Sequence, residues 1–213
     1  MLKRTKSFKF WTSEEVENTF AVNRVYEFDL MKDWLGSKNF ISAPLREKLI
    51  FFKNELSRKI EYLNEEELKA HYLIPLLDAI GFDEFGKYRT FLNRKLTSEY
   101  NGMILSGEVD FMVATGKSAP KQPFFFLHEY KQELKRDNDP LGQLLIAMIT
   151  AHTLNQENHP IYGCYVVGRL WFFVVYFNQT YSVSKAYDSA EEDIFDVASI
   201  LLKNKEQIER AFA

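Results

Sequence analysis

The sequence contains a single cysteine, Cys164, among 213 residues. One cysteine can form neither an intramolecular disulfide nor a cysteine-built zinc site within one chain, and a reducing, cytoplasmic compartment is expected. Long apolar segments are also missing, since no run of about 18 apolar residues occurs. The basic residues 1–6 are not followed by the apolar stretch of a secretion signal. Neither export nor a membrane partner is therefore expected.

An excess of positive charge is absent as well. Lys and Arg number 27 against 30 Asp and Glu, which gives a net charge of −3. This balance excludes a chain that coats nucleic acid nonspecifically, so any nucleic-acid surface must be local. The chain also lacks a glycine-rich phosphate loop, a GxSxG elbow and an HExxH pair. Nucleotide hydrolysis and ester hydrolysis by those routes have no support.

What the sequence has in quantity is apolar and aromatic side chains. Hydrophobic residues make up 46% and aromatic residues 15%, which is enough for a well-packed core in one domain of this length. Residues 1–43 mix basic, aromatic and acidic side chains without a strong period, and we interpret them as an arm or lid. Residues 44–213 are expected to form a single domain that begins and ends with a helix.

Hydrophobic spacing predicts two helices early in this domain. Between residues 44 and 63 apolar side chains recur every three or four positions, which is the spacing of one helix face. A second helix is expected over residues 64–80, because Asn64 and Glu67 form a capping-box pattern at its start and Gly81 follows its end. Pro75 lies inside this helix and should kink or split it.

The pattern then changes to strands. Residues 105–114 and 123–131 are short apolar runs on either side of a turn-forming stretch, and residues 162–167, 170–177 and 180–184 form three more. Residues 87–95 are compatible with a strand pair or a loop. Helices are expected over 139–155, capped by Asp139, and after a cap at Ser189. The order of elements predicts an α/β fold in which a mixed central β-sheet is flanked by helices.

Charged side chains interrupt two neighbouring apolar strands. Alternation places Glu129 and Lys131 on one face of their strand and His128 and Tyr130 on the other. Asp110 interrupts the preceding strand, and strand pairing can bring its carboxylate beside that of Glu129. Two close carboxylates repel each other, and a divalent cation such as Mg²⁺, which prefers oxygen ligands, removes that repulsion. His128 is better explained as a hydrogen-bonded core histidine than as a metal ligand.

Asp110 followed nineteen positions later by Glu129-Tyr130-Lys131 resembles the D…(E/D)xK motif of the PD-(D/E)XK nuclease superfamily. The resemblance covers roughly residues 64–177. Residues 162–173 are similar to strands in the nuclease domain of type I restriction enzyme subunits. The segments 128–131 and 139–143 are similar to a group of uncharacterised bacterial proteins. One departure is that Val109, rather than proline, precedes Asp110.

The resemblance implies a restriction-endonuclease-like core and a set of site residues. Asp110, Glu129 and the carbonyl of Tyr130 would bind Mg²⁺, or Mn²⁺ in its place, while Lys131 would handle the attacking water. An acid on the preceding helix is also implied at Glu67, although Glu65 or Glu66 could equally face the metal. Gln143 on the following helix matches a glutamine found in many members, and a polar surface position is the alternative for it.

The leading hypothesis from sequence is a Mg²⁺-dependent nuclease that hydrolyses DNA phosphodiester bonds, with DNA and a homodimer as the expected partners. A second hypothesis is a catalytically silent nucleic-acid-binding or interaction module of a bacterial defence system. A third is that the same residues bind a structural ion. Basic residues could neutralise phosphates beside the site, although a solvated face explains them nearly as well. These residues are Lys87, Arg89, Arg94, Lys95, Lys135 and Arg136.

Overall fold

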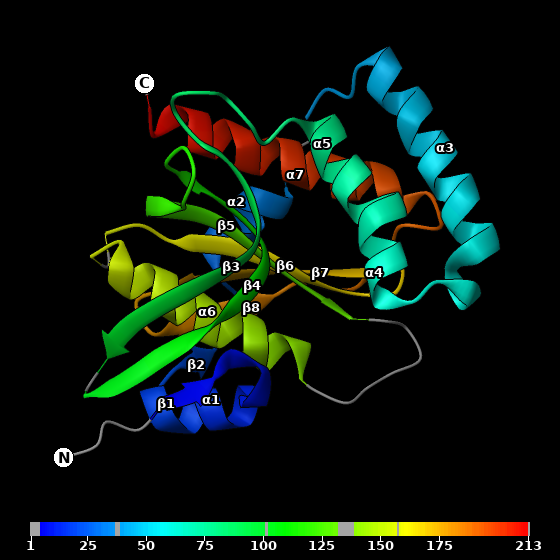
Figure 1. The fold of residues 1–213 in the computed structure, drawn as a ribbon. Coiled ribbons are helices and arrows are strands. Elements are labelled where there is room, and N and C mark those ends of the chain that lie inside the picture. Colours follow the sequence, from blue (N-terminus) through cyan, green and yellow to red (C-terminus); the bar gives the residue numbers. More distant parts are fainter. Residues whose placement is uncertain (1–4, 37–38, 101, 132–138, 157, 213) are drawn as a thin grey trace.

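A nine-stranded mixed β-sheet forms the centre of the protein, which confirms the α/β fold with a central sheet flanked by helices (Figure 1). The computed structural model describes residues 5–36, 39–100, 102–131, 139–156 and 158–212. The main strand order is β1-β4-β5-β6-β7-β8-β2, with β3 on β4 and β9 on β7 as additional partners. The β5–β6 pair is parallel, whereas β3–β4, β4–β5, β6–β7 and β7–β8 are antiparallel.

The elements follow the chain in an order close to the one predicted. The strands are β1 (Thr5–Ser7), β2 (Asn23–Arg24), β3 (Arg89–Tyr100), β4 (Met103–Thr115), β5 (Lys121–Lys131), β6 (Ile161–Val167), β7 (Leu170–Phe177), β8 (Thr180–Val183) and β9 (Tyr187–Asp188). The α-helices are α1 (Ser13–Phe20), α2 (Asp29–Leu35), α3 (Ala43–Lys59), α4 (Glu65–Leu68), α5 (Ile74–Ile80), α6 (Pro140–Leu154) and α7 (Asp193–Arg210). Three short helical turns complete the set: η1 (Phe8–Phe10), η2 (Ile60–Tyr62) and the π-helical η3 (Lys69–Leu73).

Each face of the sheet is covered by its own hydrophobic cluster. Helices α2, α3, α5 and α7 pack on one face, where the buried side chains include Trp34, Leu73 and Trp171. Helix α6 and the N-terminal elements η1 and α1 pack on the opposite face around Trp11 and Met148. Figure 1 shows the two layers on either side of the strands. Because both faces are buried, the central strands are apolar on both sides, as β5 and β7 are.

The N-terminal segment, expected as an arm or lid, is built into the sheet. Strand β1 pairs in parallel with β4, and β2 pairs in parallel with β8. Trp34 is fully buried, and its indole nitrogen donates a hydrogen bond of 3.0 Å to the carbonyl of Ile200. On the other face the backbone of residues 11–13 lies so close to Gly142 that a Cβ there would be 2.5 Å from the Trp11 carbonyl oxygen. The described residues 5–36 therefore share the core of the rest of the chain.

Residues 64–81 contain the predicted helix cap and helix end, but a π turn, which was not predicted, lies between them. Asn64 and Glu67 form the capping box, with both hydrogen bonds at 2.9 Å, and Gly81 ends α5 at a φ of +83°. Between α4 and α5 the five residues of η3 form a π turn. This turn precedes Pro75, which occupies the first turn of α5, where proline is tolerated. The helix predicted over residues 64–80 is thus divided into α4 and α5, and the π turn η3 connects them.

Two further details differ from expectation. Ser189 does not cap the last helix, which begins at Asp193; its hydroxyl instead accepts a hydrogen bond of 3.1 Å from the indole of Trp171. The basic stretch left open from sequence forms β3, an outer strand paired along its length with β4. None of the helices in the described part of the chain is long and apolar enough to cross a membrane.

Candidate functional site

The pairing of β4 with β5 stops at the two carboxylates, although β4 continues beyond Asp110 as the partner of β3. The last aligned pair of this antiparallel ladder joins Phe111 to His128, and the next positions are Asp110 and Glu129. There the amide of Tyr130 donates to Oδ2 of Asp110, at 2.9 Å, rather than to a backbone carbonyl of β4. The carboxylate of Asp110 therefore replaces a rung of the ladder. This arrangement brings Asp110 to the end of β5, as strand pairing predicts.

A bend in the β3–β4 ribbon lies at Asp110. Val109 belongs to the cluster under α6, yet Phe111 belongs to the opposite cluster, and Met112 returns to the first. The alternation of β4 therefore breaks at Asp110. On β3 the corresponding residue is Asn93, between the pairs Leu92–Phe111 and Arg94–Val109, and its φ is +49°. Asparagine is among the residues that adopt this left-handed conformation most readily, so it permits the bend.

Glu129 and Lys131 point the same way from β5, as alternation predicts. Nζ of Lys131 lies 2.8 Å from Oε1 of Glu129 and 4.0 Å from Oε2 of Glu65 on α4. Glu129 is only 7% exposed, which is unusual for a carboxylate at a strand end. The preceding helix thus contributes an acid to the site, and that acid is Glu65.

A second ammonium, that of Lys69, lies among the acids. Its Nζ is 3.0 Å from Oδ1 of Asp110, 2.9 Å from Oε1 of Glu65 and 3.3 Å from Oε1 of Glu66. The side chain is 9% exposed and lies 5.9 Å from the ring centroid of Tyr130. Lys69 belongs to the π turn η3. Single-turn π segments occur often at functional sites.

The carboxylates of the site outnumber its ammoniums, which favours the binding of a further cation. Burial, together with the charge of Asp110, raises the pKa of Glu129 to about 8, although Lys131 acts in the opposite direction. Burial alone would lower the pKa of Lys131, but the charge of Glu129 outweighs it and the pKa is raised, so this side chain is an ammonium at neutral pH. With every group ionised, four carboxylates and two ammoniums give −4 + 2 = −2.

The donor chemistry fits a divalent cation. The acids supply only oxygen ligands, which Mg²⁺ and Mn²⁺ prefer, and the negative charge of the fully ionised cluster equals in size the charge of one such ion. Lys69 and Lys131 already stand among these oxygens as internal cations. Among the described residues no three Asp, Glu, His or Cys side chains converge in a metal-binding group. In this form the carboxylates are arranged around ammonium nitrogens.

The other residues predicted for the site have different placements. Glu67 is exposed, and its carboxylate accepts the hydrogen bond from the amide of Asn64 that completes the capping box. Tyr130 lies at the site through its backbone, while its ring is buried behind the strand. Gln143 is buried in α6, and its Nε2 has no hydrogen-bond partner among the described residues. The burial of its side chain excludes the surface position that was the alternative for Gln143. Buried amide donors without a partner are rare in proteins.

Lys69 was missed in the sequence, although a signal for it exists. The residue stands between Leu68 and Tyr72, which are core positions of the same helical segment, and lies four residues before the buried Leu73. A lysine on an apolar helix face needs a partner for its charge. Glu65, four residues earlier, is one such partner, and the two together point to a buried charge cluster.

His128 is a core residue, as proposed. It is fully buried among the rings of Phe111, Phe126 and Trp171, and burial lowers its pKa well below the usual value. Its Nδ1 lies 3.0 Å from Sγ of Cys164 on the neighbouring strand β6. The pair belongs to the packing behind the site.

Basic side chains accompany the site on β3. Arg94 and Lys95 are exposed, and Arg94 pairs with Val109, one residue from Asp110. Lys87 and Arg89 lie farther along, next to Glu84 and Asp83. Lys135 and Arg136 lie outside the described residues. The outer strand of the ribbon thus carries two exposed cations near the carboxylates.

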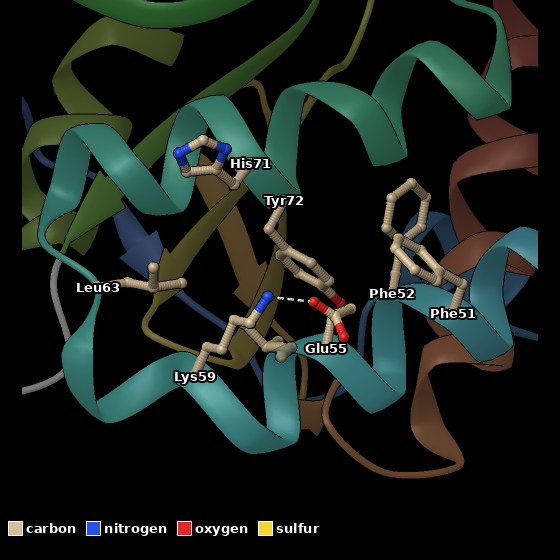
Figure 2. A pocket seen from close by; sticks show the side chains of 8 residues that line it. Phe51, Phe52, Glu55, Lys59, Leu63, His71 and Tyr72 are labelled. Atoms are coloured by element: carbon tan, nitrogen blue, oxygen red, sulfur yellow. Dashed lines mark hydrogen bonds and ion pairs between the residues drawn. The ribbon is translucent and has the colours of Figure 1, made fainter.

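A groove of about 430 Å³ lies between α3 and η3 (Figure 2). Phe51 and Phe52 of α3 and Tyr72 of η3 contribute to its walls, and an ion pair between Glu55 and Lys59 spans its edge. None of the acids of the site lines it. The groove and the acidic cluster are therefore separate features of one helical segment.

Comparison with family models and with curated proteins gives no match for this chain. Functional inference therefore rests on the site itself.

Proposed function

We propose that the protein is a metal-dependent nuclease with a restriction-endonuclease-like core, hydrolysing DNA phosphodiester bonds in the cytoplasm. The observation that carries the proposal is the meeting of Asp110, Glu129 and Glu65 around Lys69 and Lys131, at the point where the pairing of β4 with β5 stops. The spacing of Asp110, Glu129 and Lys131 supports it from sequence, and the exposed cations of β3 support an anionic substrate.

Asp110, Glu129 and Glu65, with the backbone carbonyl of Tyr130, are the groups that would hold Mg²⁺ or Mn²⁺. When bound, such an ion polarises a phosphoryl oxygen and lowers the pKa of a coordinated water. We include Glu65 rather than Glu67 in this proposed set, because the carboxylate of Glu67 accepts the hydrogen bond of the helix cap and that of Glu65 lies beside Lys69 and Lys131.

Lys131 acts in this proposal as a cation and not as a base. Its pKa is raised, so it carries its proton at neutral pH, and Glu129 holds its Nζ at 2.8 Å. From there the ammonium can donate a hydrogen bond to the attacking water or to a phosphoryl oxygen, whose negative charge grows as the new P–O bond forms. Gln143 stays in the proposed set as a buried amide of α6 whose Nε2 has no protein partner among the described residues.

Incubation with plasmid and oligonucleotide DNA, in Mg²⁺ or Mn²⁺, tests the proposal. Asp110→Asn and Lys131→Met should each reduce the cleavage rate by at least about 100-fold, the size expected for loss of an electrostatic catalytic group. Glu67→Gln is the matched control, because it removes an acid of the same helix that does not face the cluster. Equal cleavage by wild type and Asp110→Asn in both metals would refute the nuclease function.

A second candidate function keeps the fold without the chemistry. Lys69 satisfies the carboxylate of Asp110 in the described structure, as expected of a stable salt-bridge network in a nucleic-acid-binding or interaction module. Binding of DNA or of a partner protein that is unchanged in an Asp110→Asn, Glu129→Gln double variant, with no cleavage by wild type, would favour it. A structural ion would stabilise the fold without cleavage.

A further inference from the structure

Lys69 differs from the other paired lysines in the number of acids it contacts and in its burial. Its ammonium nitrogen lies within 3.3 Å of an oxygen from each of three carboxylates, those of Asp110, Glu65 and Glu66. Lys53, on α3, pairs with the exposed carboxylate of Glu192 alone and is more exposed. Lys69 thus has an all-oxygen, anionic coordination of the kind that also suits a divalent cation.

The position of Lys69 also separates two acids that the proposed function assigns to one ion. Its Nζ lies between Oδ1 of Asp110 on β4 and Oε1 of Glu65 on α4. Oδ2 of Asp110 already accepts the hydrogen bond from the amide of Tyr130. A cation that binds Oδ1 of Asp110 together with Oε1 of Glu65 must therefore take the place of this ammonium.

We propose that Lys69 is an internal counter-ion which a divalent cation displaces when it enters the site. The inference rests on the proposed metal-dependent function and adds a regulatory property to it. In the metal-free protein the ammonium neutralises Asp110 and Glu65 and keeps the two elements together. Metal binding must break these ion pairs. The observed affinity for Mg²⁺ is therefore lower than the affinity of the same carboxylates without Lys69, by the free energy of the ion pairs.

The backbone of η3 offers a route for this displacement. A π turn contains one residue more than an α-helical turn needs, and its conversion to α-helix rotates the residues that it contains. Four-carbon lysine side chains can also move their ammonium by rotation alone. Once displaced, the ammonium remains beside the site, where a DNA phosphate can take over the role of the carboxylates. Metal and phosphodiester are then expected to bind cooperatively.

Titration with Mn²⁺ followed by electron paramagnetic resonance, and with Mg²⁺ followed by calorimetry, tests the displacement in the full chain without any assay of cleavage. Lys69→Met and Lys69→Gln should each bind the ions at least about tenfold more tightly than wild type. Lys53→Met is the control, because it removes one positive charge far from the acids and should leave affinity within about twofold of wild type. Lys69→Arg, which keeps the charge, should bind no more tightly than wild type.

Thermal unfolding provides a second readout. In EDTA, Lys69→Met should have a lower Tm than wild type, because Asp110 and Glu65 then repel each other without a counter-ion. Saturating Mn²⁺ should raise its Tm by more than that of wild type. If Lys69→Met unfolds in EDTA at the assay temperature, Lys69→Gln provides the affinity measurement, since its amide can still donate to a carboxylate.

The outcomes separate this inference from the proposed function. If Asp110→Asn abolishes ion binding but both neutral variants bind as weakly as wild type, or more weakly, the displacement is refuted and the metal site stands. Weaker binding would show that Lys69 positions the ligands. If wild type, Asp110→Asn and both neutral Lys69 variants all fail to bind either ion, the metal site and the displacement are refuted together.

Discussion

Glu129 is the residue whose ionisation is most affected by its surroundings. Its pKa in the folded protein is about 8 against an ordinary value of 4.5, mainly because burial penalises the charged form. Between these two pH values the folded state binds more protons than the unfolded state does. The contribution of this group to stability is therefore present below pH 4.5 and is lost as pH rises through about 8.

We expect the free energy of unfolding in EDTA to fall more steeply with pH for wild type than for Glu129→Gln, which cannot ionise. The difference accumulated across this window should be at most a few kcal/mol, since one pKa unit corresponds to about 1.4 kcal/mol. Urea unfolding at pH 5.5 and pH 8.5 measures it. Glu66→Gln, an exposed neighbour in the same cluster, serves as control. Parallel pH profiles for wild type and Glu129→Gln would contradict the raised pKa.

At this scale the sequence predicts part of the site. The positions of Asp110, Glu129 and Lys131 follow from strand alternation and pairing, and the structure places the two acids just beyond the last aligned pair of β4 and β5. The choice between Glu65 and Glu67 does not follow, because both lie in the first turn of one helix and Glu67 also satisfies a cap pattern. Only the three-dimensional contact of Glu65 with Lys131 and Lys69 resolves it.

At the scale of elements, the bend of the β3–β4 ribbon controls the position of Asp110. Asn93→Val should destabilise the protein by about 1–2 kcal/mol, because a β-branched residue is strained at a φ of +49°. It should also weaken Mn²⁺ binding by shifting Asp110. Asn93→Gly should retain both properties, and Arg94→Val, at the next position of β3, should retain stability. Chemical denaturation and metal titration measure these effects, and a fully stable Asn93→Val variant would contradict the role of the bend.

The helices from α3 onward and strands β4 to β8 were predictable because their signals are local, whereas α1 and α2 lie in the segment interpreted as an arm or lid. Capping residues, Gly81 and the apolar period fixed the region from residue 43 to 80, and the turns before β5 and between β6, β7 and β8 separated those strands. The π turn was not predictable, because it depends on the packing of Lys69 and its neighbours against the sheet. Strand β3 was left open because its exposed, basic face lacks the apolar alternation of the inner strands.

At the scale of the whole molecule, the N-terminal segment completes both layers. We expect a chain of residues 44–213 alone to lose cooperative unfolding, because it lacks Trp11, Trp34 and the two strands that pair with β4 and β8. Loss of one buried tryptophan typically costs about 3–5 kcal/mol, which approaches the stability of a whole domain. Circular dichroism and dye binding during thermal denaturation measure this. A sharp transition in the truncated chain would show that the segment is dispensable.

The sequence did not indicate this integration, because the two N-terminal strands are only three and two residues long. Such short strands carry no readable alternation, and their partners β4 and β8 lie about 100 and 160 residues away. Packing at long range decides their structure.

The contact between Cys164 and His128 offers a direct reporter of motion. The thiol is the only one in the chain and is completely buried, and burial raises its pKa well above the usual value. Alkylating reagents can therefore reach it only when the packing over β5 and β6 opens locally, and the labelling rate measures the free energy of that opening. Because Glu129 and Lys131 lie on β5, an ion held at its end should slow the modification of a sulfur atom that it never touches.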